Sequence, residues 1–388
     1  MTSSLLQPLA SLYGGAVRLR ASLFDRGWLR SESVAAPVLS VGNLVAGGTG
    51  KTPVTLLVAR ILVEAGMRPA IVSRGYGGRR AEDPLVVSDG NAVNPEATAE
   101  KAGDEPAMLA RLLSGVPVVV ARRRVEGARL AISRLGAGSI VLDDGYQHFA
   151  LRRDFDLVLL DAAAPFDNGR TLPAGLLREG PAALARADAV AISGRASDQE
   201  AAESSSAVGL FPTPGLDPEA IMRWTRPGTP LFHFAIEPTL LVGASEPDRR
   251  AGAIAEVRDS RWFAGMRVVA FAGIARPHRL ADDLRRLGAE VVSFHPYPDH
   301  HVFTADDIRK ILGAVDAFGP GAFVTTEKDL ARLRGTPHLA ALVGKGLLAL
   351  RIEAVLPPPE LAAFKEMIVR AARRSGGPGG PLSGESAR

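Results

Sequence analysis

Short apolar runs alternate with stretches of helical apolar spacing through the first half of the chain. The uninterrupted runs predict buried strands at 37–41, 70–73, 116–121, 139–142, 157–160 and 189–192. Between several of them, apolar residues recur three or four positions apart, which predicts helices at 52–65, 105–113 and 125–135. Strands that are apolar throughout are typical of a parallel sheet with helices on both faces. The pattern therefore predicts an α/β/α sandwich.

The same rhythm returns after an interruption at 196–230, where Ser, Ala, Pro and Gly are frequent. It predicts strands at 267–272, 290–294 and 322–326, and helices at 278–287 and 304–314. A loosely alternating segment at 231–242 is the candidate for a connecting strand. We therefore expect a first domain at 31–228, a linker at 229–260, a second, smaller α/β domain at 261–372 and a disordered tail at 373–388.

An amphipathic helix is predicted within residues 1–30. Its apolar positions follow helical spacing and are Leu5, Leu9, Leu12, Ala16, Leu19 and Leu23. Arginines are interleaved and continue after the apolar stretch, whereas a secretory signal peptide places its positive charge first. Two interpretations stay open from the residues alone: a helix packed on its own domain, or one that lies in a membrane interface.

Composition narrows the classes of function. The 388 residues include 46 Lys and Arg against 42 Asp and Glu, a net charge of +4, and only 5% are aromatic. This mild basicity favours anionic small molecules or lipids over nucleic acid, whose readers carry denser basic stripes. Cysteine is absent, which excludes disulfides, thiolate metal sites and a cysteine nucleophile. No apolar run reaches the roughly 18 residues of a spanning helix.

A glycine-rich loop between the first strand and the next helix is the strongest chemical signal. It consists of Gly47, Gly48, Thr49, Gly50, Lys51 and Thr52. Backbone N–H groups of such a loop wrap phosphates, while Lys51 can reach the β- and γ-phosphates and the Thr52 hydroxyl can bind Mg²⁺. Val45 occupies the position where the general phosphate-loop pattern has glycine.

A phosphate loop also needs an acidic partner for magnesium at the end of a neighbouring strand. Asp143 and Asp144 follow one apolar strand, and Asp161 follows another. The doubled carboxylate is the better candidate because Gly-Tyr-Gln-His follows it. The alternative is that these acids only end or solubilise a strand.

Further candidates lie at predicted loop ends. Asp104 stands where a helix begins, so it is either an N-cap or a base for a sugar hydroxyl. Arg124 ends an arginine run after a strand, which suits a phosphate clamp or a solvated face. His300 lies in Asp-His-His, a pattern better explained by a histidine paired with a carboxylate than by a metal site. The segment 325–329 lacks the spacing of a guanine-reading motif.

Together these segments resemble the tetraacyldisaccharide 4′-kinase family, which phosphorylates the lipid A precursor. The matching segments are V-G-N-L-V-A-G-G-T-G-K-T-P at 41–53, S-R-G-Y-G at 73–77, G-D-E-P at 103–106, D-D-G-Y-Q-H at 143–148, N-G-R-T-L-P-A-G-L-L-R-E at 168–179, F-A-G-I-A-R-P at 271–277, D-H-H at 299–301 and T-T-E-K-D at 325–329. They follow one another in order over most of the chain, and the missing first glycine is itself a feature of the family.

The resemblance implies a P-loop NTPase-like α/β/α sandwich joined by a β linker to a smaller α/β/α domain. It also implies transfer of the ATP γ-phosphoryl group, with Mg²⁺, to the 4′-hydroxyl of a tetraacylated glucosamine disaccharide 1-phosphate. Lys51 would stabilise the transferring group, Thr52, Asp143 and Asp144 would hold Mg²⁺, and Asp104 would be the base, paired with His300. The family is further expected to use Arg124, Arg178 and Glu179 for phosphate or metal contacts.

The acylated acceptor implied by the resemblance stays in a bilayer, which favours membrane docking for the amino-terminal helix. We therefore expect a peripheral enzyme on the cytoplasmic face of the bacterial inner membrane, with no nucleic-acid partner and no obligate protein partner. The competing hypothesis is a P-loop switch or partner-loading ATPase, which phosphorylates no small molecule.

Overall fold

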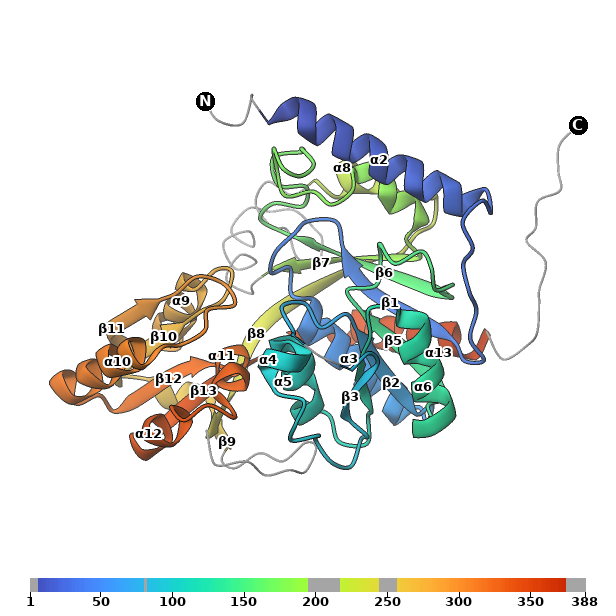
Figure 1. Ribbon diagram of the computed structural model, residues 1–388. Coiled ribbons are helices and arrows are strands. Elements are labelled where there is room, and N and C mark those ends of the chain that lie inside the picture. The colour runs from blue at the N-terminus through green and yellow to red at the C-terminus, as the bar shows by residue number, and fades with distance from the viewer. Residues whose placement is uncertain (1–5, 80–81, 195–216, 244–256, 375–388) are drawn as a thin grey trace, which may run out of the picture.

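The computed structural model describes residues 6–79, 82–194, 217–243 and 257–374. One continuous sheet runs through two lobes (Figure 1), in the strand order β11-β10-β12-β13-β8-β7-β6-β1-β5-β2-β4-β3, with β9 paired to β8. Every strand predicted from the apolar runs is present within a few residues of its expected bounds. The predicted α/β fold is confirmed.

The larger lobe holds the parallel half of this sheet, with one antiparallel edge strand, β3. Its strands are β1 (Val38–Asn43), β2 (Pro69–Ser73), β3 (Leu85–Ser88), β4 (Val118–Val120), β5 (Ser139–Asp143), β6 (Phe155–Asp161) and β7 (Ala189–Gly194). Its helical elements are α2 (Gln7–Asp25), α3 (Lys51–Glu64), α4 (Ala99–Ala102), α5 (Asp104–Leu112), α6 (Arg124–Leu135), η1 (Pro181–Arg186) and α8 (Pro218–Met222).

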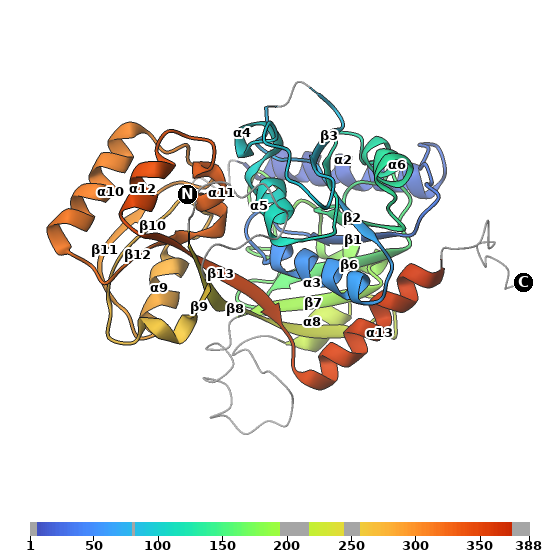
Figure 2. The ribbon, with the colours of Figure 1, turned by 90° about the horizontal axis from the view of Figure 1, so that it is seen from below.

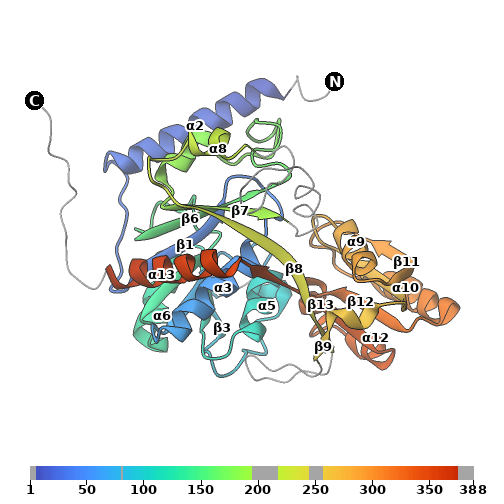
Figure 3. The ribbon, with the colours of Figure 1, turned by 180° about the vertical axis from the view of Figure 1, so that it is seen from behind.

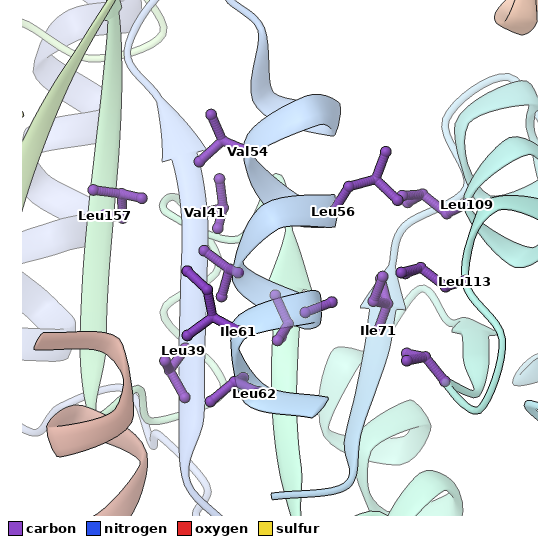
Figure 4. Close-up of a cluster of buried hydrophobic side chains, with 14 of the residues drawn as sticks. Leu39, Val41, Val54, Leu56, Ile61, Leu62, Ile71, Leu109, Leu113 and Leu157 are labelled. Carbon is purple, nitrogen blue, oxygen red and sulfur yellow. The ribbon is translucent and has the colours of Figure 1, made fainter. Parts of the chain in front are cut away.

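Successive strand residues face opposite sides, so each strand contributes to two cores. Leu39, Val41 and Ile71 pack with α3 and α5 on one face (Figure 4), whereas Val38 and Val72 pack with α6 on the other. Both faces are covered, which is why β1 and β2 are buried at every position.

The smaller lobe continues the sheet with a second parallel group. Its strands are β10 (Arg267–Ala272), β11 (Glu290–Pro296), β12 (Ala322–Thr326) and β13 (Leu347–Val355), and its helical elements are η2 (Ser260–Phe263), α9 (His278–Arg286), α10 (Ala305–Phe318), α11 (Glu327–Leu333) and α12 (Leu339–Gly344). Strands β8 (Leu231–Gly243) and β13 connect the lobes (Figure 2). Strand β8 pairs in parallel with β7 and then antiparallel with β13, and β9 (Val257–Asp259) borders the last residues of β8.

The carboxyl-terminal helix corrects one predicted boundary. Residues 356–372 were expected in the smaller domain, yet α13 (Pro358–Arg374) lies beside α3 of the larger lobe (Figure 3). Phe364, Ile368 and Ala372 are buried in the same core as β1 and α3. The chain returns because β13 carries it back along β8. The predicted tail lies outside the described residues from 375 onward.

Helix α2 packs on the protein through small residues and leaves its leucines exposed. Small residues, Ala10, Gly14 and Ala21, face the protein, and the Thr171 hydroxyl donates to the Ala10 carbonyl at 2.8 Å. The predicted apolar stripe faces outward, with Leu9, Leu12 and Leu19 exposed over 55 to 71% of their surface. Among the described residues, no helix has the length and apolar character needed to cross a membrane.

We expect Phe364→Ala to lower the free energy of unfolding by about 3 to 5 kcal/mol, because a fully buried ring is removed. That ring lies 5.2 Å, centroid to centroid, from both Phe232 and Phe234. Urea unfolding measures the change, with Phe318→Ala, at an exposed helix end, as the control. Equal stability of the two variants would contradict the position of α13 in the core.

Candidate active site between the lobes

Two buried polar side chains hold the glycine-rich loop in place. The Asn43 amide donates to the Val45 carbonyl at 2.6 Å and to the Thr49 hydroxyl at 2.8 Å, and the Ser193 hydroxyl donates to the Thr49 carbonyl at 2.7 Å. Gly50, at φ 79°, adopts a left-handed conformation immediately before α3. The loop thus connects β1 to the amino-terminus of α3, as a phosphate loop requires.

Val45 departs from the general pattern for a packing reason. Its side chain is buried beside Tyr146 and Leu177. The backbone here pairs with the loop 168–179, because the Ala46 N–H donates to the Leu176 carbonyl at 2.7 Å. A residue with an apolar side chain therefore suits this position better than glycine does.

Two acidic residues end β5 beside the loop. Asp143 is 1% exposed and accepts from the Thr55 hydroxyl at 3.2 Å, and Asp144 has a left-handed backbone, at φ 56°. The Lys51 ammonium lies 3.6 Å from Asp144, and Arg178 donates to both Asp144 oxygens at 2.8 and 2.7 Å. The structure therefore brings Lys51, Asp144 and Arg178 together.

The two carboxylates experience opposite electrostatic environments. Burial and the nearby charges of Glu105 and Asp144 raise the pKa of Asp143 to about 7. Burial also opposes ionisation of Asp144, but the positive charges of Lys51, Arg178 and Arg124 outweigh it and lower the pKa of that carboxyl. Arg124, the first residue of α6, is itself 5% exposed.

Asp104 and His300 meet across the boundary between the lobes. Asp104 is the first residue of α5 and is 5% exposed, and His300 lies in the loop after β11 with φ 58°. Their Oδ2 and Nδ1 atoms are 3.0 Å apart. Burial opposes ionisation of Asp104, but the hydrogen bond with His300 and the charges of Lys328 and Arg332 lower its pKa well below the usual range.

A second contact between the lobes lies on the other side of the phosphate loop. Arg276 donates to the buried Asp161 at 2.6 Å, and Arg279 lies 3.4 Å from the same oxygen. Asp161, the alternative magnesium partner, is thus engaged by arginines of the smaller lobe. The neighbouring Ala275 lies 3.9 Å from where a Cβ of Gly48 would stand.

Other predicted residues have different partners in the structure. Glu179 is buried and accepts from Arg186 at 3.0 and 2.8 Å. Arg186 in turn lies over the rings of Tyr146 and Phe149, 5.0 Å from each centroid. His301 is paired with Asp307 of its own lobe at 2.9 Å, so only His300 reaches the larger lobe.

The sequence interpretation missed the residues that surround Asp104 and support the loop. Arg332 and Lys328 of α11 contact Asp104, while Asn43 and Ser193 hold the loop. Lys328 lies in the segment 325–329, which matches the family but by itself indicates no contact with Asp104. Nothing in a strand-terminal Asn or Ser distinguishes a loop support from an ordinary strand end.

No group of three or more His, Cys, Asp or Glu residues is arranged to hold a metal ion in the described part of the chain. The donor chemistry nonetheless fits Mg²⁺, which is bound through one or two carboxylates with water and substrate phosphates. Burial first, and then the negative charges of Glu105 and Asp144, raise the pKa of Asp143. A hard cation bound here would favour the ionised form of this carboxyl.

Comparison with known proteins decides the family. A family model described as tetraacyldisaccharide-1-P 4′-kinase matches residues 2–372. The chain belongs to this family. The tetraacyldisaccharide 4′-kinase of Anaeromyxobacter dehalogenans strain 2CP-C is 45% identical over 345 residues, 89% of this chain and 84% of the relative. The enzyme of that name from Desulfotalea psychrophila is 38% identical over 328 residues, 84% of this chain and 86% of its own.

The structural comparison agrees. A crystal structure of LpxK from Aquifex aeolicus, in complex with ATP, superimposes with a TM-score of 0.70 at 30% sequence identity, covering 96% of this chain and all of the other. The resemblance inferred from the motifs and the P-loop kinase fold are therefore confirmed. The alternative of a partner-loading ATPase finds no support.

The raised pKa of Asp143 predicts a pH-dependent stability for the metal-free protein. The unfolded carboxyl ionises near its ordinary value of 3.8, while the folded one holds its proton to about pH 7. Stability therefore falls as the pH rises between these values. We expect Asp143→Asn, which cannot ionise, to melt at a higher temperature than the wild type at pH 8 with EDTA, and to show little difference at pH 4. A variant less stable than the wild type at pH 8 would contradict this.

Proposed function

We propose that this chain transfers the γ-phosphoryl group of ATP to the 4′-hydroxyl of a tetraacylated glucosamine disaccharide 1-phosphate. The observation that carries the proposal is the contact between Asp104 and His300 beside the phosphate loop. Such a pair can accept the proton that the attacking hydroxyl loses during phosphoryl transfer. Family membership supplies the identity of the acceptor.

ATP is assigned to the phosphate loop. The backbone of Gly47, Gly48, Thr49 and Gly50 would surround the phosphates, and Lys51 would neutralise charge on the transferring group. Lys51 and Arg178 contact Asp144 in the present structure, so both cations already lie at this end of the sheet. Arg124 would add positive charge from the start of α6.

Magnesium is assigned to Thr52, Asp143 and Asp144. When bound there, it would neutralise negative charge on the phosphates of ATP and the charge that develops during transfer. Glu179 was also predicted as a ligand, and this stays a prediction, since both its oxygens accept from Arg186.

The proton of the acceptor hydroxyl is assigned to the Asp104–His300 pair. We predicted Asp104 as the base, and its low pKa favours a division of roles. An ionised carboxylate only accepts hydrogen bonds, so Nδ1 of His300 donates to Asp104. The other nitrogen, Nε2, lies 3.6 Å from Asp299 Oδ2 and would take the proton. The acceptor oxygen then bonds to the γ-phosphorus as the bond to the β,γ-bridging oxygen breaks.

We expect Asp104→Ala and His300→Ala each to lower kcat by about 100-fold or more, since general base catalysis is lost. ATP affinity, measured by calorimetry, should stay nearly unchanged, because neither side chain belongs to the phosphate loop. His301→Ala is the matched control, because His301 pairs within its own lobe. Near-normal turnover in either variant would remove that residue from the mechanism.

The function as a whole is tested by the dependence of ADP formation on the acceptor. A kinase forms ADP in proportion to the acylated disaccharide phosphate that it converts. ADP formation at the same rate without any acceptor would support the ATPase alternative instead.

Docking of α2 on an anionic membrane surface completes the proposal. Its exposed leucines point away from the protein, and Arg18, Arg26 and Arg30 are exposed along the same segment. A helix with this distribution lies in the headgroup region with its apolar face inserted. Docking of this kind would bring the enzyme to the bilayer that holds its acceptor, and the inner membrane is the expected location.

The combined variant Leu9→Gln, Leu12→Gln, Leu19→Gln tests the docking. We expect it to lose most co-sedimentation with vesicles that contain anionic lipid, because the inserted apolar surface is removed. The control, Val63→Gln with Phe318→Gln, changes apolar residues exposed on other helices. Equal sedimentation of the two would show that α2 does not dock the protein.

A further inference from the structure

Arg332 of α11 makes the closest polar contacts that the smaller lobe offers to Asp104. Its Nε donates to Asp104 Oδ2 at 2.8 Å, and its Nη2 lies 2.7 Å from the same oxygen. This is also the oxygen that contacts His300. The arginine side chain is only 9% exposed, so these contacts are shielded from solvent.

The arginine is itself held rigidly by its own lobe. Its Nη1 donates to the Gly273 carbonyl at 2.5 Å and to Asp329 at 2.8 Å. Asp329 is fully buried and also accepts from the Gly273 N–H at 3.1 Å and the Thr326 hydroxyl at 2.6 Å. The end of β10 and the start of α11 thus fix the direction of the guanidinium group.

We propose that Arg332 is a positioning residue for the Asp104–His300 pair, holding the Asp104 carboxylate in the orientation that keeps Nδ1 of His300 as the hydrogen-bond donor. This rests on the proposed function, since it assumes that the pair accepts the proton. Arg332 touches neither ATP nor acceptor in this scheme; it acts through Asp104.

The surroundings of Asp104 show why one arginine matters. The Glu105 N–H donates to Oδ1 at 2.9 Å, and Lys328 lies 3.8 Å from Oδ2 while also pairing with Glu105 and Asp299. Arg332 likewise reaches three carboxylates, with Asp329 at 2.8 Å and Asp299 at 3.9 Å. Lys328, however, stays 3.8 Å from Asp104, whereas two nitrogens of Arg332 lie within 2.8 Å of one Asp104 oxygen. Without Arg332, the carboxylate has fewer donors to fix its orientation and a weaker positive field to keep it ionised.

A competing explanation is that Arg332 only holds the lobes together. The two explanations differ in their dependence on pH. Loss of a lobe contact lowers activity equally at every pH, while loss of a cation beside the pair makes the pair hold protons to higher pH. The acid limb of the kcat/KM profile should then move upward.

The experiment compares Arg332→Gln, Arg332→Lys and Arg332→Ala with the wild type, in full pH profiles of the acceptor-dependent reaction. We expect Arg332→Gln to lower kcat by about 100-fold and to move the acid limb up by about 1 pH unit, with ATP affinity unchanged. Arg332→Lys should have a kcat and an acid limb between those of the wild type and Arg332→Gln, because an ammonium keeps the positive charge but cannot place two nitrogens on Asp104. Added guanidinium should partly restore Arg332→Ala, since the cavity fits that ion.

The control is Arg60→Gln, which removes a 2.7 Å ion pair to Glu353 on β13, away from the pair. It should keep the wild-type profile. A parallel loss at all pH values in Arg332→Gln, without guanidinium rescue in Arg332→Ala, would overturn the inference while leaving the proposed function in place. Normal turnover of Asp104→Ala would instead overturn the assignment of the pair, and this inference with it.

Discussion

The arrangement of the site depends on the burial of one carboxylate. Asp104 belongs to the larger lobe, yet the side chains that contact it, those of His300, Lys328 and Arg332, come from the smaller one. A buried carboxylate without partners costs several kcal/mol, so the larger lobe alone could not hold Asp104 ionised. The smaller lobe is in this sense part of the active site, and its position over α5 is tied to the charge of a single side chain.

The shared sheet fixes the position of the smaller lobe relative to the larger one. Strand β8 begins as a neighbour of β7 and ends as a neighbour of β13, so one strand belongs to both lobes. Strand β13 returns along it and leads into α13, which packs against α3. Because α3 begins at the phosphate loop, the helix that carries Lys51 and the lobe that carries His300 are connected through a continuous set of backbone and core contacts.

The local pattern of apolar residues and glycines predicts much of this fold. The central strands are buried on both faces, so their apolar runs are visible in the sequence. The loop before α3 has glycine where a left-handed backbone is needed. Strand β13 and α13 escaped prediction because their partners lie far away in sequence: nothing near 347–355 indicates a pairing with β8. The same applies to Arg332. An arginine in a helix is usually solvated, and only the fold shows that Asp104, far away in sequence, lies beside it.

The amino-terminal helix shows what periodicity cannot decide. A stripe of leucines at helical spacing has the same pattern whether it faces a core or a lipid surface, and here the small residues face the protein. Helix α2 also reaches the segment that follows Asp143: Arg20 donates to the Gln147 carbonyl at 3.3 Å, and Phe24 stacks on Phe149 at 5.5 Å. The helix proposed to meet the bilayer is therefore packed, through its protein-facing side, against the segment that follows the proposed magnesium ligands Asp143 and Asp144.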